Sequence, residues 1–422
     1  MSNTLVTKRN CCRLCDSKDL MLILPMKPSP IADAFVPYDQ KDKAQPLIPL
    51  DLYQCQQCGH AQNIDIVNPE VLFRDYIFTT SSSAGLVKHF QHYAAEVANK
   101  FGFAKGSLVV EIGSNDGTLL RFFKDLGMRV LGIDPAREIA RNATQSGVRT
   151  LPEFFSSELA KQIRNEQGTA KLIVANNVYA HCDELADITE GIATLLDNDG
   201  VFIFEVSYLL DIIDNFVFDT IYHEHLSYHS IAPLVQFFQR HGLELFDVEK
   251  VSTKGGSMRC FVQRLNGPRQ ISPIVDRMMT EEMQRGLHHP KIFRQYEMQI
   301  KQRKEALNGY LTNALDQGKK IVGYGASTTV TTLMYQFELE HKLSYLIDDN
   351  VKKHRMLSPG CHLEVKPGSV LYETPPDVVI ILAWQYAKPI LQKHARFVEE
   401  NGIFVVPLPE LSIIETANCS IQ

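Results

Sequence analysis

Short apolar runs alternate with amphipathic segments through the middle of the chain. Four of these runs have the length and composition of buried strands, and they lie at 107–110, 129–133, 171–177 and 200–206. The segments 118–123 and 156–167 have the spacing of amphipathic helices. Two later runs, 243–248 and 257–262, predict an antiparallel pair joined by a glycine turn. The alternation predicts a doubly wound, mostly parallel α/β sheet, with a turn at 197–200 before its last parallel strand.

The sequence pattern is different before and after the segment that forms this predicted sheet. Prolines between residues 25 and 49 predict loops and short strands, and the charged segment 273–317 predicts a long helical connector. The candidate buried positions of that connector are Met278, Met279, Met283, Tyr296, Ile300, Leu307 and Leu311. From residue 320 a second strand–turn–helix unit begins, and further strand-like runs follow at 343–347, 377–382 and 402–407. These predict a second Rossmann-like domain.

Composition restricts the possible functions. The chain has 422 residues, of which 45% are apolar and 22% charged, as is typical of a soluble globular protein with two or three domains. A net charge of −6 does not favour binding to nucleic acid or to a membrane surface. The sequence lacks an apolar run of about 18 residues and a secretory signal pattern. We therefore expect a cytoplasmic, monomeric protein that acts on a small molecule.

Four of the nine cysteines form two C-x-x-C pairs, Cys12 with Cys15 and Cys55 with Cys58. Each pair can place two thiolates on one tight turn, and two such turns make a closed, structural zinc site. The alternatives are chance pairing or reversible disulfides. Cys11 could replace Cys12, but the two-residue gap favours Cys12. The other cysteines are interpreted as packing residues: Cys182, Cys260, Cys361 and Cys419.

A turn with two glycines follows the first strand of the predicted sheet. It reads E-I-G-S-N-D-G from Glu111 to Gly117, and a helix begins directly after it. Glycines allow a sharp turn and a close approach of the backbone to a nucleotide, although G-x-x-x-G departs from the dinucleotide pattern G-x-G-x-x-G. Glu111, together with Asp134 after the next strand, suits S-adenosylmethionine, which has a cationic amino-acid end and a free ribose. The alternative is a turn that binds nothing.

A second glycine turn, Gly323-Tyr324-Gly325, opens the C-terminal strand–turn–helix unit. A lone G-x-G is weak evidence for NAD, although Asp348 and Asp349 lie near where an acidic ribose contact could sit. We interpret the turn as facing an anionic substrate or as supporting the domain.

The densest run of ionisable side chains follows the last parallel strand and reads Y-H-E-H-L-S-Y-H-S from Tyr222 to Ser230. Open α/β sheets bind ligands at this edge. In an extended segment His223 and His225 would share one side, with Glu224 on the other. The run lacks the H-E-x-x-H spacing of a metal site, and a solvated loop is the alternative.

The chemistry of this run suits C-methylation. A neutral imidazole can remove a proton from a carbon next to a carbonyl, and Tyr or protonated His can stabilise the resulting enolate. Methyl transfer to that carbon then requires mainly alignment. Two further candidates for the site are Tyr76, in R-D-Y-I-F-T-T-S, and His181, in N-N-V-Y-A-H. Either could instead be a packing residue.

These motifs occur together in one known family. The order C-x-x-C, C-x-x-C-G-H-A-Q, E-I-G-S-N-D-G, N-N-V-x-A-H, Y-H-E-H-L-S-Y, G-G-S-M-R and G-Y-G-A-S resembles the deoxysugar C-methyltransferases of antibiotic and polysaccharide pathways. The resemblance covers nearly the whole chain. It implies an N-terminal zinc-binding module, a central Rossmann-like class I methyltransferase domain that binds S-adenosylmethionine, and a C-terminal Rossmann-like substrate domain. It also implies methylation at carbon 3 of a nucleotide-linked 4-keto-deoxysugar, typically dTDP-linked.

The resemblance assigns roles to residues. His225 would be the general base that forms the enolate. The same pocket would include Tyr222, Glu224, His181 and Tyr76. The cofactor site would comprise Glu111, Gly113, Asn115, Gly117, Asp134 and Asn177. Relatives often read G-Y-G-A-x-x-K-G at the C-terminal turn, whereas this chain lacks the lysine, so its nucleotide and phosphate contacts stay open.

We therefore predict a zinc-binding module at 1–70, a methyltransferase domain at 71–265, and a helical connector with a nucleotide-sugar domain at 266–422. Three alternatives are a methyltransferase for another small enolisable metabolite, a non-enzymatic zinc-containing scaffold, and an NAD-linked sugar oxidoreductase.

Overall fold

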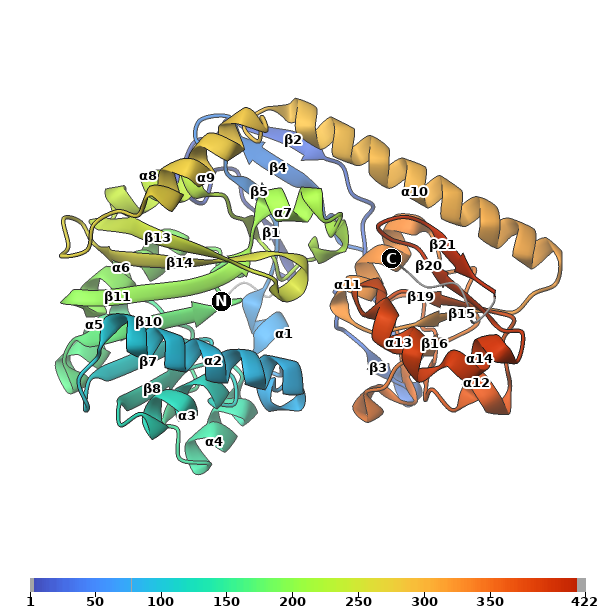
Figure 1. The fold of residues 1–422 in the computed structure, drawn as a ribbon, viewed down its shortest axis with the longest axis horizontal. Coiled ribbons are helices and arrows are strands. Elements are labelled where there is room, and N and C mark those ends of the chain that lie inside the picture. Colours follow the sequence, from blue (N-terminus) through green and yellow to red (C-terminus); the bar gives the residue numbers. More distant parts are fainter. Residues whose placement is uncertain (1–3, 77, 416–422) are drawn as a thin grey trace. The chain divides into compact units, whose positions relative to one another are not determined.

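The computed structural model describes residues 4–76 and 78–415, which form two compact units (Figure 1). The first unit contains the described residues of Met1–Met21, Gln54–Leu210 and Leu226–His288. The second contains those of Leu22–Tyr53, Asp211–His225 and His289–Gln422. The chain therefore passes between the units several times. The division into three domains at residues 70 and 265 stays a prediction.

A seven-stranded sheet forms the centre of the first unit. Its strands, in spatial order, are β13 (Leu243–Val251), β14 (Ser257–Arg264), β11 (Leu196–Ser207), β10 (Ala170–Asn176), β7 (Leu108–Ile112), β8 (Arg129–Ile133) and β9 (Thr150–Leu151). The strands from β11 to β9 are parallel, and β14 runs antiparallel to both β11 and β13. The predicted sheet is thereby confirmed. Its strand order reverses between β7 and β10, where open α/β sheets bind ligands.

The expected turn at 197–200 is wrong, because β11 already begins at Leu196 and runs through this segment. Ala170 of β10 pairs with Leu196, whereas Leu172 pairs with Val201. The register therefore shifts, and the extra residues of β11 are absorbed as an irregularity within the strand.

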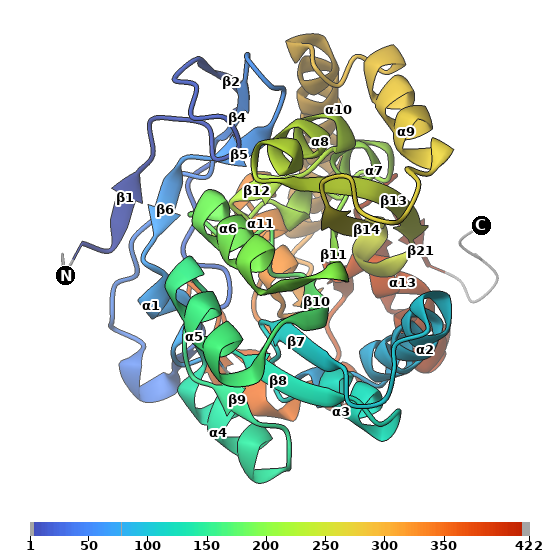
Figure 2. The same ribbon diagram turned by 90° about the vertical axis from the view of Figure 1, so that its left-hand side faces the viewer.

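Helices cover both faces of this sheet, with α5 and α6 on one side and α2 on the other (Figure 2). The helices of this unit include α1 (Pro69–Phe73), α2 (Ala84–Phe101), α3 (Thr118–Asp125), α4 (Arg137–Gln145), α5 (Ser157–Gln167), α6 (Leu185–Leu195) and α8 (Ile231–Arg240), while α7 (Leu209–Asp214) begins in this unit and continues into the second. α2 begins after Ser83, whose side chain accepts a backbone N–H, and ends at Gly102 in the left-handed conformation. Its buried face packs Phe90 and Val97 against α3 and the sheet.

A six-stranded sheet forms the centre of the second unit. Its order is β18 (Val365–Lys366), β16 (Leu346–Ile347), β15 (Ile321–Tyr324), β19 (Val378–Ile381), β20 (Ile403–Val406) and β21 (Ser412–Ile414). Only β21 is antiparallel to its neighbour. The helices of this unit are α10 (Pro290–Asp316), α11 (Thr328–Phe337), α12 (Val370–Glu373), α13 (Ala387–Lys393) and α14 (Ala395–Glu399). The predicted second Rossmann-like sheet is confirmed.

The predicted connector at 273–317 consists of two helices, α9 (Pro273–Gln284) in the first unit and α10 in the second. Four of its expected core positions are buried, namely Met278, Tyr296, Leu307 and Leu311. Met283 is 69% exposed, so that expectation is wrong. It lies five residues after Met278, which places it about 140° away around the helix.

The first 70 residues pair with several parts of the chain. In the first unit β1 (Val6–Lys8) pairs with β6 (Asp65–Val67), and β5 (Ala61–Asn63) pairs with β12 (Ser227–Tyr228). In the second unit β3 (Val36–Pro37) pairs with β17 (Met356–Leu357). The chain passes between the units within β2 (Leu20–Leu24) and β4 (Leu52–Cys55). The expected loops and short strands between 25 and 49 are confirmed.

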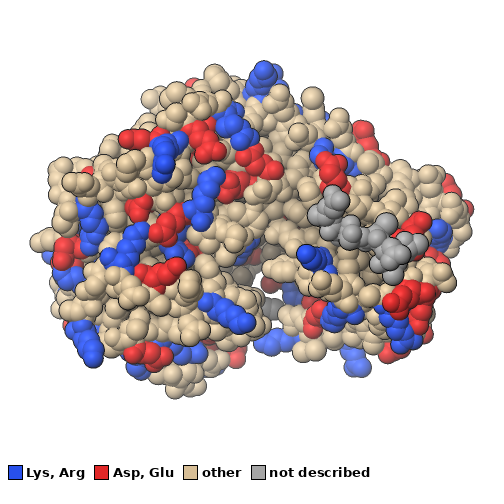
Figure 3. Space-filling model, in the orientation of Figure 1, with Lys and Arg blue, Asp and Glu red and all other residues tan. Residues whose placement is uncertain are grey.

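Acidic and basic side chains are interspersed on the face that Figure 3 shows. Within residues 4–76 and 78–415, the helices are all too short or too polar to span a bilayer.

Candidate active site and metal centre

The two C-x-x-C pairs come together in the first unit. The sulfur atoms of Cys12, Cys15, Cys55 and Cys58 lie within 4.8 Å of one another. The Cys12 and Cys58 sulfurs are 3.6 Å apart and the Cys15 and Cys55 sulfurs 3.4 Å apart, well beyond the roughly 2.05 Å of a disulfide. Four thiolates around a tetrahedral zinc ion, with Zn–S bonds of about 2.3 Å, require this kind of spacing. The residues therefore fit the predicted structural zinc site.

Two tight turns present these sulfurs. The N–H of Asp16 donates to the Cys12 carbonyl, and the N–H of Gly59, at φ +81°, donates to the Cys55 carbonyl. Each C-x-x-C pair therefore closes one turn. Cys11 lies outside the cluster, so Cys12 is the ligand of the first pair.

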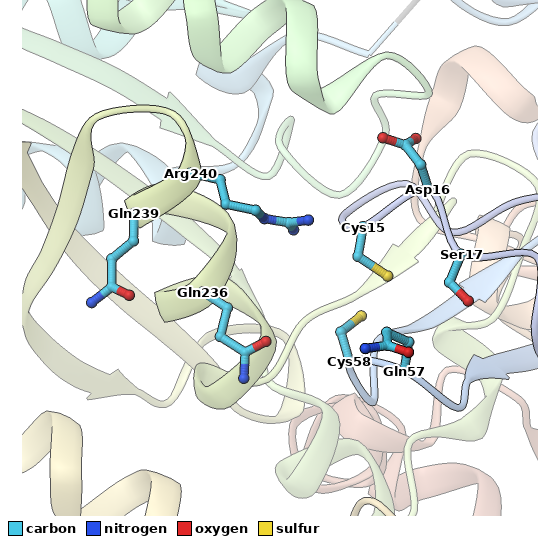
Figure 4. A pocket seen from close by; sticks show the side chains of 8 residues that line it. All are labelled: Cys15, Asp16, Ser17, Gln57, Cys58, Gln236, Gln239 and Arg240. Carbon is cyan, nitrogen blue, oxygen red and sulfur yellow. The ribbon is translucent and has the colours of Figure 1, made fainter.

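A polar pocket opens beside two of the sulfurs (Figure 4). Its lining consists of Cys15, Asp16, Ser17, Gln57, Cys58, Gln236, Gln239 and Arg240. The Arg240 guanidinium donates to the carbonyl of Leu14 and so ties α8 to the first cysteine turn. The pocket contains none of the predicted catalytic residues. Among the other cysteines, Cys260 is fully buried in β14, as expected for a packing residue, and Cys419 lies outside the described residues.

The predicted cofactor turn lies between β7 and α3 in the first unit. Gly113, Asn115 and Gly117 have φ values of 71°, 49° and 74°. A Cβ atom at Gly113 would lie 2.2 Å from Val178 Cγ2, so this position requires glycine for both conformation and space. Asp134, after β8, accepts the N–H of Asn115 at 2.7 Å. The carboxylate is thereby fixed beside the turn, where it can also accept ribose hydroxyls.

The side chains of Asn115 and Asp116 hold another segment of the first unit. Asn115 Oδ1 accepts the N–H of Thr80 at 2.8 Å, and its Nδ2 donates to the carbonyl of Phe78. Asp116 accepts the N–H of Ser81 at 2.9 Å. Sequence reasoning missed Asp116, although Asn and Asp before a helix often bind backbone groups in this way. The cofactor role of Asn115 stays a prediction.

Buried polar groups surround this turn. Glu111 of β7 is 3% exposed, and its Oε2 has no hydrogen-bond partner among the described residues. Burial raises the pKa of Glu111 well above its usual range, and the negative charges of Asp134 and Asp116 add to this. Asn176, at the end of β10, is also buried, whereas the predicted Asn177 follows it at φ 56° and donates its N–H to β11. A cationic ligand would complete the hydrogen bonding and the charge balance here.

Tyr76 and His181 share an aromatic neighbour in the first unit. Phe73, the last residue of α1, stacks on His181 with ring centroids 5.8 Å apart and planes at 8°. Its ring centroid lies 6.3 Å from that of Tyr76. Both predicted residues are half-buried. The structure therefore brings them to one place, through a phenylalanine that carries no distinguishing signal in the sequence.

The segment that carries His225 belongs to the second unit and is a turn, because the N–H of His225 donates to the Tyr222 carbonyl at 2.9 Å. The segment is therefore not extended, and the expected alternation of His223 and His225 on one side with Glu224 on the other does not apply. His225 Nδ1 lies 2.7 Å from the Thr220 carbonyl oxygen, and Nε2 lies 2.9 Å from the Tyr222 hydroxyl. Since a carbonyl can only accept, Nδ1 carries the proton, and the neutral ring offers its lone pair at Nε2.

The alternative of a solvated loop is wrong. Glu224 and His225 are 5% and 6% exposed. His223 Nε2 contacts the Ile48 carbonyl at 3.2 Å, and burial lowers its pKa to about 4. Burial also lowers the pKa of His229, in the first unit, to about 4. These two histidines are therefore neutral packing residues, and His225 differs from them by its phenol partner.

A buried carboxyl group that sequence reasoning missed comes directly before Thr220. Asp219, in the short 3-10 helix Phe218–Thr220, is 1% exposed. Its Oδ2 accepts the indole N–H of Trp384 at 2.8 Å, and its Oδ1 has no partner in the described part of the chain. Burial raises the pKa of Asp219 to about 7.

The turn after β15 in the second unit has the hydrogen-bond pattern of the cofactor turn. The N–H groups of Gly325 and Gly113 each donate, at 2.7 Å, to the carbonyl of the last residue of the neighbouring strand. Asp348 accepts the N–H of Ala326 at 2.7 Å, as Asp134 does in the first turn. Each turn therefore sets a carboxylate beside a glycine.

A lysine lies at this second turn. Lys353 Nζ is 2.7 Å from the carbonyl oxygen of Ala326 and 2.9 Å from Asp33. Its ammonium group therefore lies beside the turn and is paired with a carboxylate, whereas the lysine position of the motif is Thr329 in this chain.

Comparisons with known proteins agree on the class of protein. Residues 12–73 match a family described as "Putative zinc binding domain", residues 86–248 one described as a methyltransferase domain, and residues 252–409 one described as a C-methyltransferase C-terminal domain. The C-methyltransferase NovU of Streptomyces niveus is 31% identical over 404 residues, which cover 96% of each chain. The chain belongs to the C-methyltransferase family.

Solved methyltransferases resemble part of this C-methyltransferase. One is the magnesium protoporphyrin IX methyltransferase of Synechocystis PCC 6803, solved with bound S-adenosylmethionine. It is 17% identical with a TM-score of 0.33, and the match covers 43% of this chain and 80% of that chain. Another is an S-adenosylmethionine-dependent methyltransferase of Clostridium acetobutylicum ATCC 824. It is 13% identical with a TM-score of 0.35, and the match covers 42% of this chain and 92% of that chain.

S-adenosylmethionine is the cofactor of this C-methyltransferase, and the four-cysteine cluster is its zinc centre. The cofactor supplies an electrophilic methyl group on a sulfonium. The residues whose geometry fits it are Gly113 and Gly117 at the turn, with Asp134 and Glu111 beside them.

Proposed function

We propose that this C-methyltransferase methylates carbon 3 of a nucleotide-linked 4-keto-deoxysugar, most simply a dTDP-linked one, with His225 as the general base. The observation that carries the proposal is the hydrogen bonding of His225. The Thr220 carbonyl holds the N–H at Nδ1, and this leaves Nε2 as an acceptor 2.9 Å from the Tyr222 hydroxyl. A neutral imidazole is a suitable base near neutral pH.

The reaction follows from these groups. His225 Nε2 takes the proton from carbon 3, and the electron pair of the C–H bond moves to the carbonyl oxygen at carbon 4 to give an enolate. Hydroxyl and imidazole donors stabilise this negative charge, and we assign that work to Tyr222, His181 and Tyr76, with Glu224 as a further pocket residue. Carbon 3 then takes the methyl group, whose bond to sulfur breaks, and the proton on His225 leaves to solvent.

The second unit supports the proposed nucleotide. Its turn at Gly325 and Asp348 has the hydrogen-bond pattern of the cofactor turn, and turns of this kind hold nucleotides on parallel sheets. A diphosphate carries negative charge, and Lys353 offers a cation at this turn. We therefore propose that Lys353 replaces the lysine that the sequence motif lacks.

The test is hydrogen exchange followed by methylation. The protein is incubated in D2O with a dTDP-4-keto-6-deoxysugar, first without and then with S-adenosylmethionine, and the sugar is analysed by mass spectrometry. His225→Gln should reduce both deuterium uptake and methylation at least about 100-fold, because an amide can donate to Thr220 but cannot act as the base. Its affinity for S-adenosylmethionine should stay unchanged.

His223→Gln is the matched control, because an amide can also reach the Ile48 carbonyl that His223 contacts, and it should retain exchange. Wild-type exchange in His225→Gln would refute the base assignment. Methylation of other small ketones, without any reaction of the dTDP-linked sugar, would refute the substrate and leave the base standing.

A further inference from the structure

The four cysteines of the zinc centre differ in how much of each side chain faces solvent. Cys12 and Cys55 have no exposed surface, whereas Cys15 and Cys58 are half-buried and line the polar pocket beside the centre (Figure 4). All the lining residues belong to the first unit. Four thiolates close the metal ion itself to incoming ligands. The two sulfur atoms at the pocket are therefore the part of the centre that a small molecule can reach.

The pocket suits a small, neutral molecule that forms hydrogen bonds. Its volume is about 790 Å³, whereas a water molecule occupies about 30 Å³. Besides the two cysteines its lining has one acid, one cation and four neutral polar side chains, which are Ser17, Gln57, Gln236 and Gln239. Hydroxyl and amide groups offer donors and acceptors without a net charge. Hydrogen peroxide matches this lining in size and polarity, and a thiolate is the form of cysteine that attacks it.

Each sulfur at the pocket has a buried sulfur of the other cysteine turn beside it. The Cys15 sulfur lies 3.4 Å from that of Cys55, and the Cys58 sulfur lies 3.6 Å from that of Cys12. Peroxide that enters through the pocket leaves its oxygen on the pocket side of the sulfur that it oxidises. A second thiolate must attack that sulfur from the side opposite to the departing oxygen. The buried cysteine of the other turn is therefore the partner in each case.

We propose that Cys15 and Cys58 form a peroxide-sensitive site, at which oxidation cross-links the two cysteine turns and releases the zinc ion. The Cys15 thiolate attacks one peroxide oxygen, the O–O bond breaks, and hydroxide leaves a sulfenic acid behind. The Cys55 thiolate then attacks the Cys15 sulfur, the S–O bond breaks, and a second hydroxide leaves. The two thiolates have lost two electrons, which the peroxide has taken up.

Cys58 and Cys12 react in the same way with a second molecule of peroxide. Each disulfide removes two of the thiolates that hold the metal, so the centre loses its zinc ion as the pairs form. A dithiol reductant restores the thiolates. This reactivity belongs to the zinc centre alone and does not depend on the proposed sugar or on the base.

The test follows zinc release and disulfide pairing in the intact, zinc-loaded protein. Peroxide is added at increasing molar ratios, a chromophoric chelator reports released zinc, and dimedone traps the first sulfenic acid. Trypsin cuts after Arg13 and so separates Cys12 from Cys15, while fragmentation in the mass spectrometer distinguishes Cys55 from Cys58. We expect dimedone on Cys15 or Cys58 and, without dimedone, disulfides that join Cys15 to Cys55 and Cys12 to Cys58. A dithiol with added zinc should restore the centre.

Gln236 tests entry through the pocket, because its exposed side chain lines the wall that α8 provides. Gln236→Trp should slow zinc release by peroxide at least about tenfold, since the reactivity of a thiolate depends on access to it. Gln236→Ala is the matched control and should release zinc at least as fast as the wild type. Both variants should keep the zinc content and the unfolding temperature of the wild type.

Three results would overturn the proposal. One is dimedone on Cys12 or Cys55 as readily as on the two cysteines at the pocket, because release would then follow general unfolding. Another is a disulfide within one C-x-x-C pair in place of the cross-linked turns. The third is zinc release from Gln236→Trp at the rate of Gln236→Ala.

Discussion

Replacement of Asp219 by asparagine should stabilise the second unit at alkaline pH and change it little in acid. The carboxyl group is buried, Trp384 donates to one oxygen, and the other has no partner among the described residues. Burial raises its pKa to about 7 from an ordinary 3.8. Asparagine keeps the size of the side chain and an acceptor for the indole N–H, but it cannot ionise.

The sign follows from proton linkage. Between the two pKa values the folded unit keeps a proton on Asp219 that the unfolded chain has lost, so the free energy of unfolding falls as the pH rises through this range and levels off above about 7. The shift corresponds to about 4 kcal/mol at most. Asp219→Asn removes this loss. The variant should therefore gain up to about 4 kcal/mol relative to the wild type between about pH 4 and about pH 8.5.

The assay uses the single tryptophan of the chain, Trp384, whose indole donates to Asp219. Its fluorescence reports unfolding of the second unit in urea, measured for both proteins at about pH 5 and about pH 8.5. In the folded wild type the same emission should titrate with a midpoint near 7. The emission of Asp219→Asn should show no titration near this pH.

Asp349 provides the control in the same unit. Its side chain is 52% exposed. Partial burial alone would raise its pKa, but Lys393 and Tyr324 hold the pKa of Asp349 below its usual range. Its ionised form therefore favours the fold, and Asp349→Asn should not gain stability as the pH rises. A constant difference between wild type and Asp219→Asn across this pH range would refute the reasoning.

Other parts of the structure give testable outcomes too. Cys55→Ser should lower the zinc content measured by atomic absorption, and a chelator should lower the unfolding temperature of the wild type toward that of the variant. Gly113→Ala should abolish calorimetric binding of S-adenosylmethionine, because the new Cβ would lie 2.2 Å from Val178 at a φ of 71°; a near-normal circular dichroism spectrum would show that the variant folds. Met278→Ala should destabilise the first unit by about 2–5 kcal/mol in urea, whereas Met283→Ala, at a position 69% exposed, should change it by less than about 0.5 kcal/mol.

The sheets were predictable because each strand is a short apolar run with its own local signal. The zinc ligands were predictable for the same reason, since C-x-x-C is a local spacing. The turn at 197–200 misled because D-N-D-G is typical of turns, while β11 runs through this segment between its pairs with β10 at Leu196 and Val201. Met283 misled because it lies five residues after the buried Met278 in α9, about 140° away around the helix.

The residues that sequence reasoning missed depend on partners far along the chain. Asp219 and Trp384 are 165 residues apart, so no local pattern joins them. For His225 the sequence indicated the residue, whereas its tautomer required the Thr220 carbonyl, which a turn brings within 2.7 Å.

The zinc turns have a consequence for the segment that follows His225. Arg13, inside the first C-x-x-C pair, is buried and donates to the carbonyl of Leu226, the residue directly after His225. The N–H of Leu226 donates in turn to the carbonyl of Ala180, next to His181. A zinc ion that keeps the first turn folded would therefore also hold Leu226 in place within the first unit. Four thiolates leave it no open position for chemistry, so its role is to hold this turn and, through Arg13, Leu226.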